Sequence, residues 1–482
     1  MKNNIISSFI WKFSERILAQ VVSFIVSVIL ARMLLPESYG IVAMVMVFIN
    51  IANVFVTSGF NSALIQKKDA NETDFSTIFY CSLGVACFIY LILFIFAPQI
   101  AIFYKTKELT PILRVFGLKI IIASYNSIQH SYISRNMMFK KFFFSTLGGT
   151  IISGIIGILM AYHGFGVWAL VAQYLINSVM DSIILTFTIE WKPKLVFSLD
   201  SAKGLMSYGW KVLCSSLIGT IYNNLRSLII GRTYSSADLA YYNKGKNFPD
   251  LIINNVVVSI TSVLFPTMSN ANGDASIVRQ LTRKSIRVTS YLVFPMMMGM
   301  AMVAKPFTVI LLTEKWLGSV IFMQLCCLQC AFHTVSDTNL QAINAMGRSD
   351  IVLKLEFIKK PIGILLLILA IPHGIFMVVL TMPLTGLYTM MVNMLPNRKL
   401  LGYGFIEQIM DLIPAIIMSI IMGVCIYPIS LLGLSNIMTL VVQITLGIIV
   451  YVVLSVISKN EAFLWIFERM RGLKSNKQQR VA

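Results

Sequence analysis

The stretch FIVSVILARMLLPESYGIVAMVMVFINIANVFVTSGFNSALI (residues 24–65) contains two long apolar runs, separated by a short turn that holds Arg32, Pro36 and Glu37. A helix needs about 20 mostly apolar residues to cross the hydrocarbon core of a bilayer. Extended to their flanking residues, the runs cover 13–34 and 40–65. Backbone groups in hydrocarbon must be hydrogen-bonded within their own segment, so both runs are expected to be helical. The stretch therefore predicts two transmembrane helices.

Apolar runs of the same kind recur along the whole chain. Of the 482 residues, 57% are hydrophobic and only 12% are charged, and the mean hydropathy is +0.80. A soluble protein carries about 25% charged residues. The sequence therefore predicts an all-α polytopic membrane protein, and the short connections leave no room for a soluble catalytic domain.

Fourteen runs are bounded by charged, proline or glycine residues. The expected helices cover 13–34, 40–65, 77–103, 112–134, 142–162, 166–189, 207–231, 240–266, 287–312, 318–345, 353–371, 374–395, 408–428 and 436–457. The N-terminus continues into the first run without a small-residue cleavage site, so it is interpreted as a span and not as a removed signal.

The basic residues cluster in alternate connections, which explains the net charge of +19. Lys67 and Lys68, Arg279 and Arg283, and the tail after Lys459 lie on one side, whereas the opposite connections hold few Lys or Arg. Nucleic-acid binders concentrate such charge on one exposed patch, so no nucleic-acid partner is expected. By the positive-inside rule both termini are predicted to be cytoplasmic.

An internal repeat is visible at an offset of about 200 residues. Matching pairs are Trp11-Lys12 and Trp210-Lys211, ILAR and IIGR ending at Arg32 and Arg232, ESYG (37–40) and DLAY (238–241), and SALI (62–65) and SVLF (262–265). The repeat predicts two six-helix lobes, 1–195 and 200–400, followed by two additional helices over 401–458 and a basic tail over 459–482. Because six is even, the lobes should be related by an axis along the membrane normal.

Several motifs resemble those of one transporter family. They are ARMLLPESYGIVAM, SGFNSALIQKKD, FAPQIAIFYKTKELTPILRVFGL, GFGVWALV, VLFPTMSNANGD and LLTEKWLGSVIFMQLCCL. Together they resemble the Wzx-type polysaccharide flippases, in particular the branch that serves colanic acid and teichuronic acid export. This family shares a superfamily with the multidrug and toxin extruders and with the lipid II flippase.

The resemblance implies a function at the bacterial inner membrane. The expected activity is transfer of undecaprenyl-diphosphate-linked oligosaccharide repeat units from the cytoplasmic to the periplasmic leaflet by alternating access. Expected partners are this lipid-linked substrate, membrane lipids, and a polysaccharide polymerase or export machinery. The resemblance does not fix the sugar.

Basic residues inside the predicted spans are candidates for holding the diphosphate, because a charge within the bilayer is costly unless it faces water or a partner. The candidates are Arg226, Lys119, Lys246 and Arg16. Arg226 is the strongest, since it lies within an otherwise apolar run next to Asn223 and Asn224. The alternative is that these side chains extend to the interface as many Lys and Arg residues do.

Arg32 and Arg232 occupy equivalent places in the two lobes, at the outer ends of the first and seventh helices. A cation at a helix C-terminus is stabilised by the helix dipole, by up to about 1 kcal/mol. A gate or a substrate contact is the other interpretation.

An ion gradient is the expected driving force, because the chain has no Walker motif for ATP. Asp337 and Asp181 are the candidate proton or sodium sites, and His333 precedes Asp337 by four residues, on the same helix face. Each carboxylate could instead neutralise a lysine or hydrogen-bond another helix.

Neither a metal site nor a catalytic residue is expected, and no cofactor. Cys326, Cys327 and Cys330 lack further ligands at zinc spacing and are interpreted as packing residues. Two other functions are alternatives. A multidrug or cation antiporter would need an acidic, aromatic cavity, and a membrane glycosyltransferase or polymerase would need carboxylates or a large loop at the membrane surface. The charges inside the predicted spans are more basic than acidic, and the outer connections are short. Both features favour the flippase.

Overall fold

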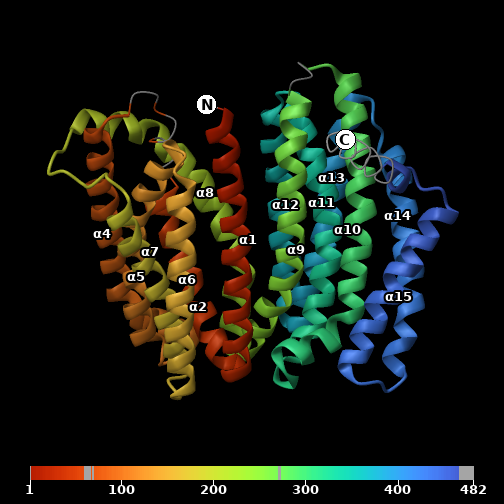
Figure 1. The fold of residues 1–482 in the computed structure, drawn as a ribbon, viewed down its shortest axis with the longest axis horizontal. Helices are drawn as coiled ribbons and strands as arrows, with labels where there is room; N and C mark the ends of the chain where they lie inside the picture. Colours follow the sequence, from red (N-terminus) through yellow and green to blue (C-terminus); the bar gives the residue numbers. More distant parts are fainter. Residues whose placement is uncertain (1, 59–63, 65–66, 68–69, 270–272, 466–482) are drawn as a thin grey trace, which may run out of the picture. The chain divides into compact units, whose positions relative to one another are not determined.

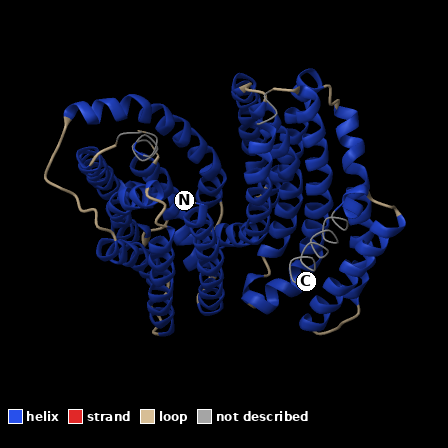
Figure 2. Cartoon of the chain, turned by 45° about the horizontal axis from the view of Figure 1, so that its top comes forward, coloured by secondary structure: helices blue, strands red, loops and turns tan. Residues whose placement is uncertain are grey.

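The computed structural model describes residues 2–58, 64, 67, 70–269 and 273–465, without the side chains of 2–17, 139, 208, 257–266 and 269. Within these residues the chain folds into helices joined by short connections and contains no strand (Figures 1 and 2). It divides into two compact units, Met1–Ala240 and Tyr241–Ala482. The all-α fold class is confirmed.

Unit 1 contains seven long helices in its described part. They are α1 (Lys2–Met33), α2 (Pro36–Thr57), α4 (Glu72–Tyr104), α5 (Leu109–Arg135), α6 (Phe139–Tyr162), α7 (Val167–Thr188) and α8 (Leu199–Thr233). α6 packs against α1 and α7, α5 against α2, α4 and α7, and α8 against α2 and α4. An aromatic core of Phe75, Phe79, Tyr132 and Trp191 closes the end of this unit where α4 begins.

The described part of unit 2 holds most of α9 (Ser236–Ser269) and six further long helices. These are α10 (Ala275–Leu312), α11 (Ser319–Ala345), α12 (Ser349–Ala370), α13 (Ile375–Leu401), α14 (Phe405–Ile426) and α15 (Asn436–Ile457), with short 3₁₀ turns at Glu314–Trp316, Ile371–His373 and Tyr427–Leu431. α11 packs between α10 and α13, and the last two helices, α14 and α15, pack against α10 and against each other.

Each of the fourteen expected helices corresponds to one helix in the described residues, but several boundaries differ. α1 begins at Lys2, eleven residues before the expected start. α2 begins at Pro36, a residue suited to the first helical turn, and ends at Thr57 instead of residue 65. α8 begins at Leu199, eight residues before the expected start, and α10 begins at Ala275, twelve residues before it. Both early starts have a side-chain cap, since Ser198 accepts from Ser201 N and Asp274 accepts from Ser276 N.

Ten helices in the described residues are long and apolar enough to cross a membrane. The described apolar part of α1, Leu18–Met33, is shorter, and α8, α9 and α12 carry more charged residues. The chain is therefore a multi-pass membrane protein, while fourteen spans and the two pseudo-symmetric lobes remain predictions.

Candidate functional site

Asp181 in α7 is the centre of a polar cluster inside unit 1. Its carboxylate accepts from His130 Nε2 on α5 at 2.9 Å, from Asn126 Nδ2 on the same helix at 3.4 Å, and from the Ser145 hydroxyl on α6. The Asp181 side chain is 14% exposed, whereas that of His130 is 37% exposed. The acidic group is thus nearly enclosed, while its histidine partner stays within reach of water.

The cluster continues along the same three helices. Tyr125 Oη lies 2.8 Å from Thr186 Oγ1, which also accepts from Gln129 Nε2 at 3.1 Å. On the other side, Asn177 Nδ2 donates to Thr150 Oγ1 and Ser153 Oγ, each at 3.4 Å. α5, α6 and α7 therefore meet along a hydrogen-bonded polar seam, although α5, α6 and α7 are all apolar enough to span a membrane.

Asp337, the second acidic candidate, pairs with His333 as its spacing predicted. Nδ1 of His333 lies 3.1 Å from Oδ2 of Asp337 on α11, and their side chains are 56% and 26% exposed. On the same helix the buried thiol of Cys330 donates to Asp250 Oδ1 of α9 at 3.7 Å. Each of the two carboxylate candidates therefore has its own histidine partner, and the Asp181 side chain is the more enclosed.

The basic candidates occupy different environments. Lys119 in α5 is partly buried, and its Nζ lies 5.7 Å from the centre of the Phe116 ring and 5.2 Å from that of Tyr174. Lys246 Nζ lies 4.0 Å from Asp250 Oδ2. Lys119 is thus held over aromatic faces, which attract cations, whereas Lys246 is matched by an acidic residue.

Arg226 is partly buried in α8, two residues after Asn224. The Asn224 side chain accepts from Asn50 Nδ2 of α2 at 3.3 Å, so the polar face of α8 meets a polar residue of α2. Arg16, the remaining basic candidate, lies outside the described side chains. The structure brings Arg226 and Lys119 into one unit and places Lys246 in the other.

The equivalent arginines Arg32 and Arg232 both lie in the last turn of their helices, α1 and α8. Arg32 is exposed, and the guanidinium of Arg232 lies 5.1 Å from the centre of the Phe103 ring of α4. Their positions suit the negative end of a helix dipole.

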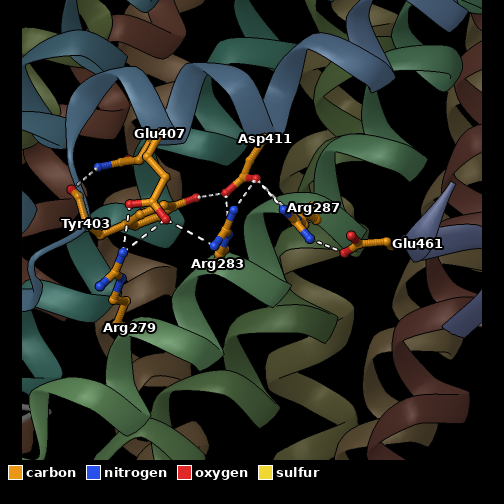
Figure 3. Close-up of polar contacts among 8 residues, drawn as sticks. Arg279, Arg283, Arg287, Tyr403, Glu407, Asp411 and Glu461 are labelled. Atoms are coloured by element: carbon orange, nitrogen blue, oxygen red, sulfur yellow. Dashed lines mark hydrogen bonds and ion pairs between the residues drawn. The ribbon is translucent and has the colours of Figure 1, made fainter.

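An ion-pair network that was not predicted from the sequence joins the start of α10 to the start of α14 (Figure 3). Arg279 Nη2 donates to both oxygens of Glu407, at 3.0 and 2.9 Å. Arg283 reaches Glu407 through Nη1 at 3.0 Å and Asp411 through Nε at 2.8 Å. These four charged side chains, two on α10 and two on α14, form a ladder of ion pairs.

The ladder ends on the residues after α15. Arg287 Nη2 donates to Asp411 Oδ1 at 2.6 Å, and its Nη1 pairs with Glu461. Tyr403, in the turn before α14, donates its hydroxyl to Asp411 Oδ2 at 2.7 Å. Burial raises the pKa of Tyr403, so its phenol stays protonated and can donate. Asp411, only 4% exposed, therefore joins α10, the turn before α14 and, through Arg287, the segment after α15.

A signal for this network was present in the sequence. Arg279, Arg283 and Arg287 are spaced by four residues, and so are Glu407 and Asp411. Such spacing places each set on one helix face. The expected helix begins only at residue 287, so Arg279 and Arg283 are interpreted from the sequence as loop charges that fix the topology.

Comparison with known proteins gives the family. The model of a family described as polysaccharide biosynthesis protein matches residues 29–321, more than half of the chain. The succinoglycan biosynthesis transport protein ExoT of Rhizobium meliloti (strain 1021) is 25% identical over 329 residues, which cover 68% of this chain and 67% of that protein. The teichuronic acid biosynthesis protein TuaB of Bacillus subtilis (strain 168) is 25% identical over 309 residues, or 62% of each chain.

The fold is also known from solved structures. The chain superposes on the lipid II flippase MurJ, in an inward closed conformation, with a TM-score of 0.76 and 19% identity over 94% of this chain and 98% of that one. At this identity the likeness shows the fold alone. The family model, by contrast, is matched directly by the sequence, and the chain belongs to the polysaccharide biosynthesis protein family.

Proposed function

We propose that this protein is a flippase that moves lipid-linked oligosaccharide repeat units across a bacterial inner membrane by alternating access. The family match over residues 29–321 carries the proposal, and the names of ExoT and TuaB support a role in polysaccharide export. Both termini would lie in the cytoplasm, and a polysaccharide polymerase would take up the product. The protein would act without chemical change to its substrate, as a transporter and not as an enzyme.

The substrate class follows from the charges inside the helices. A diphosphate that crosses hydrocarbon needs cations and hydrogen-bond donors to replace its water. Arg226, Lys119, Lys246 and Arg16 would supply them, with Arg32 and Arg232 as gate residues. Lys119 suits this role because aromatic rings hold it, and among the described residues no carboxylate forms an ion pair with it that a ligand would have to displace.

An ion gradient would drive the transfer through Asp181. An enclosed carboxylate hydrogen-bonded to a histidine and a serine can exchange a proton or bind a cation, because the surrounding donors and acceptors can reorient. Asp337 with His333 is the second candidate for this role.

Reconstitution tests the proposal. The purified protein would be placed in vesicles with a fluorescent undecaprenyl-diphosphate-linked disaccharide, and the fluorophore exposed on the outer leaflet would be quenched by dithionite. We expect faster transfer between leaflets than in vesicles without protein, and further acceleration by a proton or sodium gradient. Transfer equal to that of empty vesicles, combined with gradient-driven efflux of ethidium, would favour the antiporter.

A further inference from the structure

The connection from α7 to α8 and the first turns of α8 carry large apolar side chains that no described residue covers. Leu195 is 95% exposed and Leu199 66%, and Phe197, Met206 and Trp210 are each about half exposed. They lie at the charged end of unit 1, next to the exposed pair Lys194 and Glu72. Apolar surface gathered at a polar end of a protein marks an interaction site.

This exposure is not the result of a loosely held segment. Lys194 N donates to Ser76 Oγ and Ser198 N donates to Thr77 Oγ1, each at 3.1 Å, so the connection is fastened to the first turns of α4. Trp191 is buried in the aromatic core below it. The backbone therefore holds the apolar side chains outward.

The start of α8 has three distinct faces. The first faces the protein, through the buried residues Ala202, Leu205 and Gly209, of which Leu205 joins the core around Trp191. The second is an exposed, mainly apolar stripe at intervals of four, three and four residues, made by Leu199, Lys203, Met206 and Trp210. The third is exposed and polar, with Asp200, Ser207 and Lys211.

A helix with a protein face, an apolar face and a polar face suits the boundary between a bilayer and water. α8 has 35 residues, which at about 1.5 Å per residue exceeds the roughly 30 Å hydrocarbon core. Its first turns run across the end of unit 1, at a steep angle to the other helices of that unit (Figures 1 and 2). A segment at this angle to membrane-spanning helices is placed to lie along the surface of the bilayer.

We propose that residues 195–211 form an interfacial anchor that binds the anionic lipid leaflet on this side of the membrane. Leu199, Met206 and Trp210 enter the upper acyl-chain region, where tryptophan is favoured. Lys203, in the middle of the same stripe, pairs with lipid phosphate, and Asp200 and Ser207 face water. The charge favours lipid as the occupant, since a basic residue within an apolar stripe complements an anionic headgroup above acyl chains. This anchor does not depend on which substrate the protein carries.

Nitroxide labels test the three faces. Single cysteines would replace Leu199, Met206, Asp200 or Ser207 in the full chain freed of its own seven cysteines, in nanodiscs of phosphatidylcholine and phosphatidylglycerol. We expect the ratio of oxygen to nickel-chelate accessibility to be several-fold higher at 199 and 206 than at 200 and 207. Equal, high nickel access at all four positions would overturn the anchor, and so would shielding of 199 and 206 from both reagents, which would mean that protein covers the stripe.

Lipid charge provides the second measurement. With the label at 206, Lys203→Glu should lower the accessibility ratio in nanodiscs that contain phosphatidylglycerol and leave it unchanged in pure phosphatidylcholine. Lys107 is an exposed lysine outside this segment, so Lys107→Glu is the matched control. It should leave the accessibility ratio at 206 unchanged in both kinds of nanodisc. If the accessibility ratio at 206 changes neither with Lys203→Glu nor with phosphatidylglycerol, the recognition of anionic lipid is contradicted.

Discussion

Gly40, near the start of α2, lies directly against the backbone of Ser236 at the start of α9. A Cβ atom at position 40 would be only 1.8 Å from the Ser236 carbonyl oxygen. The sequence repeat predicts that the turns around these residues, ESYG (37–40) and the turn that leads into DLAY (238–241), are equivalent. In the structure the two turns meet through a contact that only glycine permits.

Gly40→Ala should therefore force this contact apart. Overpacking of a close site costs about 1–3 kcal/mol, so we expect a lower thermal unfolding temperature of the detergent-solubilised protein. Gly84→Ala is the matched control, because a Cβ there meets nothing within 4 Å. An unchanged melting temperature for Gly40→Ala would show that the turns can separate without loss of stability.

Asp411→Asn should weaken the attachment of the last two helices to α10 and so lower the free energy of unfolding. The change keeps the shape of the side chain but removes the charge that Arg283 and Arg287 share. Breaking a buried ion pair costs about 3–5 kcal/mol, and the partial exposure of both arginines places the expected loss near the lower end. The free energy of unfolding in denaturant measures it.

Glu461→Gln is the control within the same network. Glu461 is 76% exposed, and exposed pairs contribute about 0–1 kcal/mol. Its replacement should change stability little. Equal losses for both variants would mean that burial of Asp411 is not what gives the network its strength.

The sequence predicted what depends on local pattern. Apolar runs located every helix, and the four-residue spacing of His333 and Asp337 predicted their contact, because neighbours on one helix face are fixed by helical geometry. Contacts between distant helices were missed. His130 is the partner of Asp181, which lies 51 residues further along the chain, and no helical spacing links the two. Hydropathy locates helices but contains no record of which faces meet.

The early start of α10 was missed for a related reason. Residues 275–286 are too polar to look like part of a span, and the positive-inside rule explains their arginines without any partner. In the structure these turns are helical and capped by Asp274, and their arginines pair with Glu407 and Asp411.

The predicted topology can be tested at Ser276, an exposed residue in the first turn of α10, close to the basic residues Arg279 and Arg283. In intact cells that carry a cysteine-free variant, a cysteine at 276 should not react with a membrane-impermeant maleimide, whereas one at Lys107 should, because the positive-inside rule places these connections on opposite sides. Labelling of the cysteine at 276 in intact cells would mean that this connection faces outward and that the predicted orientation is wrong.

Asp181→Asn should uncouple transport from the ion gradient. The amide keeps hydrogen-bonding capacity toward Ser145 and Asn126 but cannot exchange a proton or balance a cation, so gradient-driven transfer in vesicles should fall by about tenfold or more. Transfer without a gradient should persist. Asp337→Asn separates the two carboxylate candidates: if it alone abolishes the response to the gradient, coupling resides in α11 and Asp181 is structural.

Arg226 is expected to bind the lipid diphosphate. Two substitutions distinguish the contribution of its positive charge from that of the shape of its guanidinium group. Arg226→Ala should abolish transfer of the undecaprenyl-diphosphate-linked disaccharide while the amount of folded protein in the membrane stays unchanged. Arg226→Lys should restore transfer in part, because the ammonium keeps the charge but not the two-pronged contact that a guanidinium makes with phosphate. Asn223→Ala, an exposed neighbour on the same helix, is the control and should keep most of the activity. Normal transfer by the Ala variant, or loss of folded protein in parallel with activity, would assign Arg226 to packing between α8 and α2 and leave the diphosphate to Lys119 and Lys246.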